Sequence, residues 1–348
     1  MSTHASFRVP AALARVPALA ALGAMALCAT IWALPAAAEP VRVVASIKPV
    51  HSLASGVMAG IGEPHLIVRG SGAPHTYGLA PSDAEALEKA RVVFWVGPTL
   101  EAFLARALGN LSRGATVVAL AQSPGVKRLP LREGGGFEAH ADDDDHDRAD
   151  DKHANDHDKK PGKTAKTEGG GHRHGEIDSH VWLNTENAIA MVKTIERTLA
   201  KADPGNAPRY AANAADVVSR LQALTNDIRL GLRPVAKRPF VVFHDGYQYF
   251  EKQFGLSTVG AITLSPETQP GARRIRDIRD KIRALGANCI FAEPQFDSRI
   301  VRSIADATGI RTGVLDPLGA TLADGPQLYF ELMRQNAAAI KDCLSPAS

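Results

Sequence analysis

Short apolar runs and longer amphipathic segments alternate along most of this chain. The run 92–96, which reads Val-Val-Phe-Trp-Val, is typical of a strand buried on both faces of a parallel sheet. Segments such as 272–285 instead place apolar residues at helical spacing between charged ones. Strands that alternate with helices at this spacing predict βαβ units and hence parallel sheets.

The pattern predicts particular elements. Strands are expected at 41–46, 65–68, 92–96, 116–120, 240–243, 257–264, 288–292 and 311–315. Helices are expected at 49–61, 83–90, 99–111, 184–202, 206–232, 247–254, 272–285, 298–308 and 327–343. Ser82 with Glu85 forms a capping box for the second of these helices, and Asn184 is a suitable N-cap for the fourth.

The helix at 206–232 divides the pattern into two α/β lobes. At 1.5 Å per residue it would be roughly 39 Å long, enough to run along both lobes. We therefore expect an N-terminal lobe at 39–205, a linker helix at 206–232 and a C-terminal lobe at 233–348. A chain of 348 residues has room for two domains.

Residues 1–38 have the pattern of a cleavable export signal. Arg8 and Arg15 precede the apolar stretch 18–34, and small residues follow at 36–38. An uncleaved membrane anchor is the alternative, because the apolar stretch is near the lower length limit for spanning a bilayer. Lipidation at Cys28 is disfavoured by the bulky Leu27 before it. We expect an exported protein.

Composition excludes little, but cysteine usage agrees with export. A hydrophobic content of 45%, a charged content of 22% and a net charge of +3 are ordinary for a globular protein and suggest no nucleic-acid partner. Without the signal, the remaining cysteines are Cys289 and Cys343. A bridge between them would close a loop of roughly 55 residues and add about 4 kcal/mol of stability. Two free buried thiols or a thiolate pair on a metal remain alternatives.

One segment, 137–174, is too polar to bury a core and is predicted to be a mobile insert. It contains the aspartate-rich run 142–147. It also holds half of the twelve histidines of the chain: His140, His146, His153, His157, His172 and His174. Imidazole and carboxylate groups both ligate divalent metals. A solvated acidic linker is the simpler interpretation, but the histidines favour weak, auxiliary metal binding.

Four further candidate ligands follow predicted strands or the insert: His75, His180, His244 and Asp316. Any one of them could be an ordinary loop residue. In parallel sheets, however, ligands gather beyond the carboxyl ends of the strands. Three imidazoles and a carboxylate are a typical tetrahedral zinc set. The four together therefore predict a Zn²⁺ site.

The chain resembles the periplasmic zinc-binding component of zinc-uptake ABC transporters, a cluster A-I solute-binding family. The resemblance rests on these segments: Pro74-His75-Thr76-Tyr77, Pro81-Ser82-Asp83, His180-Val181-Trp182-Leu183, Phe243-His244-Asp245-Gly246-Tyr247, Tyr249-Phe250-Glu251, Phe291-Ala292-Glu293-Pro294-Gln295-Phe296 and Leu315-Asp316-Pro317-Leu318-Gly319. It implies two pseudo-symmetric lobes of parallel sheet and helices, joined by one rigid helix, with the metal in the cleft between them.

The resemblance also implies roles for residues and partners. His75, His180 and His244 match the family's metal ligands, with Asp316, a water or a nearby carboxylate completing the sphere. Glu293 is expected to accept a hydrogen bond from an imidazole N–H. The Cys289–Cys343 bridge is similar to one in the family. The implied protein is a periplasmic monomer and not an enzyme; it carries Zn²⁺ to a membrane permease.

Some positions depart from the family pattern. Pro74 stands where some relatives carry Glu, so the fourth ligand must come from elsewhere. Ala261 stands where some carry a histidine, so a secondary metal site tied to that histidine is not expected. His51 and His65 match no family ligand and are expected to be structural or surface residues.

Three alternatives remain open. One is a manganese- or iron-binding member of the family, although such members commonly carry Glu where His244 stands. Another is a secreted zinc hydrolase, although HExxH and GxSxG motifs are absent from the sequence. The last is a zinc buffer in which the insert does all the binding.

Overall fold

The computed structural model describes residues 40–132, 137, 177–263 and 270–346. Within it, two four-stranded sheets follow one another along the chain, and every pair of neighbouring strands is parallel. The strand orders are β2-β1-β3-β4 and β6-β5-β7-β8, so each sheet has the same order relative to its own first strand. This repeat confirms the predicted α/β fold of two similar lobes.

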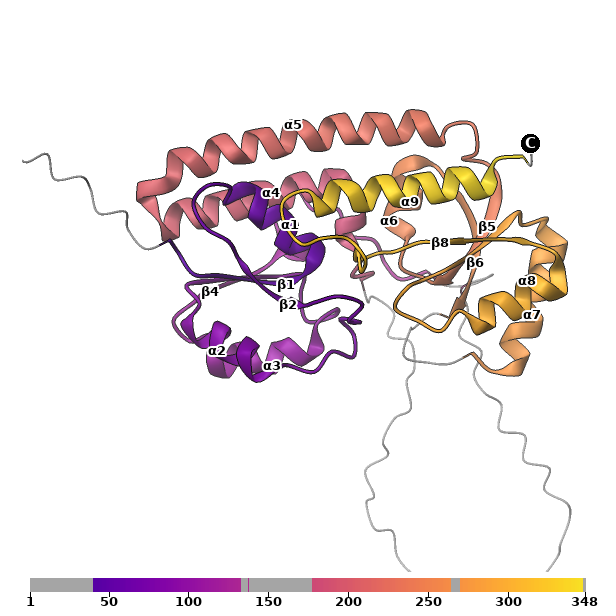
Figure 1. Ribbon diagram of the computed structural model, residues 1–348, viewed down its shortest axis with the longest axis horizontal. Coiled ribbons are helices and arrows are strands. Elements are labelled where there is room, and N and C mark those ends of the chain that lie inside the picture. The colour runs from indigo at the N-terminus through magenta and orange to yellow at the C-terminus, as the bar shows by residue number, and fades with distance from the viewer. Residues whose placement is uncertain (1–39, 133–136, 138–176, 264–269, 347–348) are drawn as a thin grey trace, which may run out of the picture. The chain divides into compact units, whose positions relative to one another are not determined.

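The first sheet consists of β1 (Val43–Ile47), β2 (His65–Val68), β3 (Val92–Trp95) and β4 (Thr116–Ala119). Two helices, α1 (Lys48–Val57) and α4 (Thr185–Ala202), lie on one face, and α2 (Pro81–Lys89) and α3 (Ala102–Leu111) lie on the other (Figure 1). Strands β1 and β3 are buried along their whole length, because helices cover both faces.

The second sheet consists of β5 (Pro239–His244), β6 (Ser257–Thr263), β7 (Cys289–Ala292) and β8 (Arg311–Val314). Helices α7 (Ala272–Leu285) and α8 (Arg299–Thr308) pack on one face, and α9 (Leu328–Leu344) covers the other (Figure 1). A short helix, α6 (Gln248–Phe254), connects β5 to β6. The disulfide between Cys289 and Cys343, whose Cα atoms lie 6.1 Å apart, ties β7 to the end of α9 and confirms the predicted bridge.

The long helix α5 (Ala207–Leu232) packs against α1 and α4 from the first half of the chain and against α9 from the second (Figure 1). Its buried apolar residues recur every three or four positions, as an amphipathic helix requires: Tyr210, Ala214, Val217, Leu221, Leu224, Ile228 and Leu232. One continuous core therefore runs from the first sheet through α5 to the inner face of the second. The region from Pro40 onward is one compact unit.

Most predicted bounds agree with the structure to within a few residues, and two local predictions are wrong. The capping box at Ser82 and Glu85 does not form: α2 begins at Pro81, and its N-cap is Ala80, which makes no side-chain bond. Proline at the first helical position needs no N–H partner and already has a helical φ. Helix α3 begins at Ala102 instead of residue 99, because Glu101 turns back to accept hydrogen bonds from the amides of Val96 and Gly97.

A segment of the first half of the chain is fastened to α6 and to the residues before it. The Arg132 guanidinium donates to Asp245 at 2.9 and 3.1 Å and also pairs with Glu251. Pro130 forms an antiparallel bridge with Ile177, so residues on the two sides of the predicted insert lie next to each other. Because Asp245 directly follows His244, these contacts hold the two halves of the chain together beside that histidine.

Replacing Arg132 with Met is expected to lower the free energy of unfolding by about 2–3 kcal/mol. The substitution leaves the carboxylates of Asp245 and Glu251, which are only 8% and 6% exposed, without their cation. The matched control is Lys127→Ala, which breaks an exposed pair with Glu186 and should cost below about 1 kcal/mol. Urea denaturation of both variants measures the difference. Equal losses would contradict a buried clamp at Arg132.

Candidate metal centre

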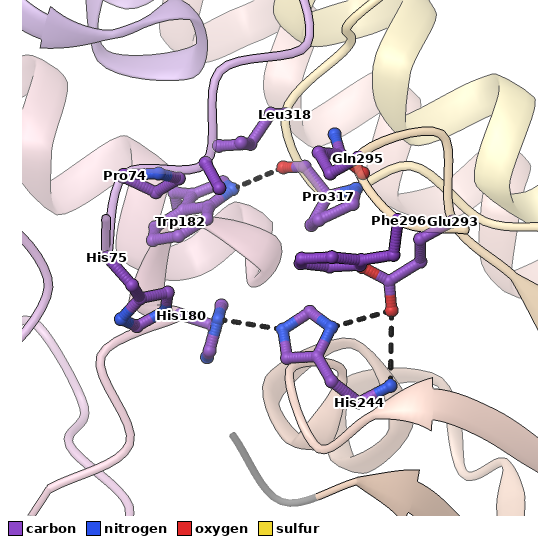
Figure 2. A pocket seen from close by; sticks show the side chains of 11 residues that line it. Pro74, His75, His180, Trp182, His244, Glu293, Gln295, Phe296, Pro317 and Leu318 are labelled. Atoms are coloured by element: carbon purple, nitrogen blue, oxygen red, sulfur yellow. Dashed lines mark hydrogen bonds and ion pairs between the residues drawn. The ribbon is translucent and has the colours of Figure 1, made fainter. Parts of the chain in front are cut away.

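Three histidines from separate parts of the chain lie close together where the two halves meet. His244 is the last residue of β5, His180 immediately precedes the short 3-10 helix η3 (Val181–Leu183), and His75 lies in the loop after β2. The Nε2 atoms of His180 and His244 are 3.2 Å apart, and the two ring centroids are 5.1 Å apart. The ring centroid of His75 is 5.8 Å from that of His180 (Figure 2).

Two of these imidazoles are oriented by carboxylates. The Nδ1 of His180 lies 2.8 Å from Asp178 Oδ1, and the Nδ1 of His244 lies 2.6 Å from Glu293 Oε1 (Figure 2 shows the second contact). An ionised carboxylate only accepts, so each Nδ1 carries the proton and each neutral ring presents an Nε2 lone pair. The backbone amides of His180 and His244 donate to the same two oxygens, which fixes the rings further.

Two Nε2 lone pairs that face one another at 3.2 Å cannot hydrogen-bond each other, but they suit a shared cation. Nitrogen ligands at about 2.0–2.1 Å from zinc, at the tetrahedral angle, lie roughly 3.3 Å apart. Carboxylates behind ligating histidines are a general feature of metal sites, where they fix the tautomer and raise the basicity of the ring.

Burial and charge act differently on the pKa values of His75 and His244. Burial, reinforced by the nearby rings of His180 and His244, lowers the pKa of His75 to about 3, so this ring is neutral near pH 7. Burial also lowers the pKa of His244, but the charge of Glu293 and its hydrogen bond raise it by more, and the net pKa lies above the usual value. A metal at His244 therefore competes with a proton that Glu293 stabilises.

A cavity of about 20 Å³ opens onto the imidazoles. It is lined by Ala73, Pro74, His75, His180, Trp182, His244, Glu293, Gln295, Phe296, Pro317 and Leu318. This volume admits about one water molecule or ion, whereas organic ligands occupy roughly 300–1,000 Å³. The cavity fits a small inorganic ligand.

Gly246 makes the close approach of the two rings possible. A Cβ atom at this position would lie 2.3 Å from the Nε2 of His244 and 3.1 Å from the Nε2 of His180. Both distances are shorter than van der Waals contact, so any larger residue would displace the atoms that face each other. Gly246 was part of a motif in the sequence, but its role follows only from the structure.

Asp316 is placed differently from the other three predicted ligands. It is not among the residues that line the cavity. Its carboxylate accepts from the amides of Leu318, Gly319 and Ala320 and from the side chain of Gln295. In this structure Asp316 therefore closes the turn that it begins.

The remaining predicted residues have simpler placements. Glu293 accepts from the Nδ1 of His244, which is the contact expected of it. The ring of His51 bonds to the carbonyl of Pro64 and that of His65 to Asp83, so both have the structural contacts that were expected. The six histidines of the insert, His140, His146, His153, His157, His172 and His174, lie outside the described residues, as do residues 1–38, where the export signal is predicted.

Asp178 is the contact that the sequence analysis missed. The signal was present as Asp178-Ser179-His180, because a spacing of two lets an aspartate bond the ring and the amide of the same histidine. Among the described residues, no three His, Cys, Asp or Glu side chains already stand close enough to hold a metal ion. His180 and His244 are the pair that is in position, and His75 is the nearest further imidazole in the cavity wall.

The fold and this centre define a two-lobed α/β protein with an imidazole cluster where its lobes meet. The chain belongs to the family described as "Zinc-uptake complex component A periplasmic", whose profile matches residues 43–343. The high-affinity zinc uptake system protein ZnuA of Brucella suis biovar 1 (strain 1330) is 48% identical over 315 residues, which are 89% of this chain and 93% of that protein. ZnuA of Yersinia pestis is 34% identical over 92% of this chain and 96% of its own.

Solved structures show the same fold. A crystal structure of ZnuA superposes with a TM-score of 0.69 at 22% identity, covering 88% of this chain and all of the other. The solute-binding protein FpvC of Pseudomonas aeruginosa, in complex with Mn²⁺, superposes with a TM-score of 0.68 at 21% identity over 88% and 98% of the two chains. Across the described ranges of the present structure, no helix is both long and apolar enough to cross a membrane.

Proposed function

We propose that this protein captures Zn²⁺ in the periplasm and delivers it to the membrane permease of an ABC-type zinc-uptake system. The observation that carries the proposal is the pair of Nε2 atoms of His180 and His244, 3.2 Å apart and each backed by a carboxylate. Family membership and the zinc-uptake names of the relatives support it. The family is that of a transport component and not of an enzyme.

The proposed ligands are His75, His180 and His244. The ring of His75 lies 5.8 Å from that of His180, farther than the 5.1 Å between His180 and His244, so binding would bring His75 closer to the other two. Imidazole donors favour zinc over manganese, which prefers oxygen ligands. A manganese or iron carrier is the second candidate, supported by fold similarity to proteins solved with Mn²⁺. A zinc hydrolase is disfavoured, because a cavity of about 20 Å³ has no room for an organic substrate.

The periplasmic location follows the family description, and the export signal at 1–38 remains part of the proposal. A monomer is proposed for the free protein, with the permease as its partner.

Metal titration of the mature protein tests the function. The expected result is one tight Zn²⁺ per chain, with zinc retained through purification and Mn²⁺ unable to displace it. A protein that takes up Mn²⁺ or Fe²⁺ more tightly than Zn²⁺, or that binds no metal tightly, would contradict the proposal.

Deleting residues 138–171 is expected to leave the tight site intact and to remove additional weak sites. Histidines spread through a polar segment must bear the entropic cost of ordering the chain when they ligate a metal. The contact of Arg132 with Asp245 and the bridge between Pro130 and Ile177 involve no residue of the deleted segment, so they should hold the flanking chain in place. Calorimetric zinc titration of both forms measures the change. Loss of the tight site together with the insert would place the primary site in the insert.

A further inference from the structure

Lys48 is a buried cation that connects the two halves of the chain. It is the first residue of α1 and is only 4% exposed. Its Nζ donates to the carbonyls of Leu322 at 2.8 Å and Ala320 at 3.4 Å, and it lies 3.1 Å from Asp324 Oδ1. A lysine is almost never buried without partners, and a positive charge is unfavourable at a helix N-terminus. The three acceptors, all from the loop between β8 and α9, therefore hold this side chain in a place that it would otherwise avoid.

The loop that Lys48 holds also forms part of the wall of the imidazole cavity. Pro317 and Leu318, near the beginning of the loop, line this cavity. The carbonyl of Pro317 accepts a hydrogen bond of 2.8 Å from the indole N–H of Trp182, which lines the cavity as well (Figure 2). This part of the wall belongs to the second half of the chain, but two side chains of the first half, Lys48 and Trp182, are bonded to it.

The loop is closed by its own main-chain bonds. The carboxylate of Asp316 accepts from the amides of Leu318, Gly319 and Ala320. The amide of Leu322 donates to the carbonyl of Gly319 at 3.1 Å. Gly319 has a φ of 73°, and a Cβ atom there would lie 3.2 Å from Leu322 Cδ1, so the turn is also tightly packed. Because the turn is compact, the place of Leu318 in the cavity wall depends on where the carbonyls of Ala320 and Leu322 are held.

We propose that Lys48 is a positioning residue for the metal site: it fastens the loop 317–324, keeps Pro317 and Leu318 in the cavity wall and thereby slows the release of a bound ion. The inference rests on the proposed function and adds to it a residue that controls how long the ion stays. The cavity of about 20 Å³ leaves little room beyond one ion, so a small retreat of its wall would admit water and open a way out.

The three contacts of Lys48 differ in strength. Its bonds to the carbonyls of Ala320 and Leu322 join a charged donor to main-chain acceptors in a place where the lysine is buried, so they should carry most of the effect. The side chain of Asp324 is 47% exposed, and its pairing with Lys48 should contribute less. Loss of the lysine is therefore expected to matter more than loss of the aspartate.

The test measures the rate of Zn²⁺ dissociation by stopped-flow capture with excess chelator, using Lys48→Met, Leu318→Ala and the double variant in the full chain. Lys48→Met removes the donor and keeps an extended side chain, and we expect it to speed dissociation about 10- to 100-fold, the factor for one hydrogen bond from a charged group. Leu318→Ala thins the wall directly and should also speed dissociation. The double variant should be little faster than the faster single one, because Lys48 acts through the wall. The visible spectrum of bound Co²⁺ should stay unchanged, because no ligand is altered.

Arg238→Met is the matched control. Arg238 also donates to a main-chain carbonyl, that of Leu344 at 2.9 Å, but it does not line the cavity. Its loss may lower the melting temperature and should leave the rate of zinc dissociation unchanged, which separates a general loss of stability from a loosened wall. Asp324→Asn should speed dissociation by about fivefold at most, as expected for an exposed pair.

A wild-type dissociation rate in Lys48→Met, together with faster release from Leu318→Ala, would overturn the inference, because the wall would then not depend on Lys48. Additive effects in the double variant, or a Co²⁺ spectrum altered by Lys48→Met, would also overturn it. If Lys48→Met does not fold, Leu318→Ala still decides, since an unchanged rate there shows that the wall does not control release. Wild-type protein that binds no zinc contradicts the proposed function, which is a separate outcome.

Discussion

Replacing His244 with alanine is expected to weaken zinc binding by about two to three orders of magnitude. A four-ligand zinc site is worth about 10–16 kcal/mol, so one ligand contributes roughly 3–4 kcal/mol, and 1.4 kcal/mol corresponds to a factor of ten. The ring of His244 also contacts Glu293, so removing the ring leaves a buried carboxylate without this partner. Chelator competition in the mature protein measures the loss.

His180→Ala and His75→Ala should give losses of the same order if the three rings bind one metal. His180 belongs to the other half of the chain, and its removal leaves the contact between Glu293 and His244 in place. The variant His180→Ala therefore shows the effect of losing one ligand without the effect of leaving Glu293 unpaired. The control is His51→Ala, because His51 bonds to the carbonyl of Pro64 and does not line the cavity. Wild-type affinity in all three ligand variants would refute the proposed site.

Saturating zinc is expected to stabilise the folded protein by about 4 kcal/mol when free metal is a thousandfold above its dissociation constant. At roughly 2.1 cal/mol/K of unfolding entropy per residue, a folded chain of about 300 residues would melt roughly 6 °C higher. The effect arises because the ligands come from both halves of the chain and an unfolded chain does not hold them together. Calorimetric melting with zinc and with excess chelator measures it.

The matched control for the linkage is His244→Ala, whose melting temperature should respond little to the same zinc concentration. A magnesium titration of the wild type controls for ionic strength, since imidazoles do not suit Mg²⁺. If the midpoint of the wild type is the same with zinc and with chelator, the three histidines do not form one site across the two halves.

The strands and helices could be predicted because burial leaves a periodic trace in the sequence. The run 92–96 reads as a strand because helices cover both of its faces, and the apolar positions of 206–232 recur because α5 packs along one side. His244 could be proposed as a ligand because a residue that ends a parallel strand lies at the edge where ligands collect. The bridge between Cys289 and Cys343 could be favoured by number, since two cysteines remained.

The roles of individual side chains could not be predicted in the same way. A sequence does not show which donors a carboxylate oxygen accepts hydrogen bonds from, because this depends on the groups that pack around it. Asp316 carries the expected residue type at the expected strand end, yet its carboxylate is taken up by the amides of its own turn. Ser82 has the right spacing for a cap, but Pro81 begins the helix before it.

By itself, the sequence determined the alternation of strands and helices, the long helix α5 and the place of His244 at the end of a parallel strand. These features depend on the local periodicity of apolar residues and on the direction of parallel strands, both of which can be inferred from residues near one another in the sequence. Only the tertiary structure decided that His180 and His244 face each other beside Gly246 and that Asp178 and Glu293 hold them. Those relations join residues far apart in the chain, and packing of the two halves sets their distances and directions.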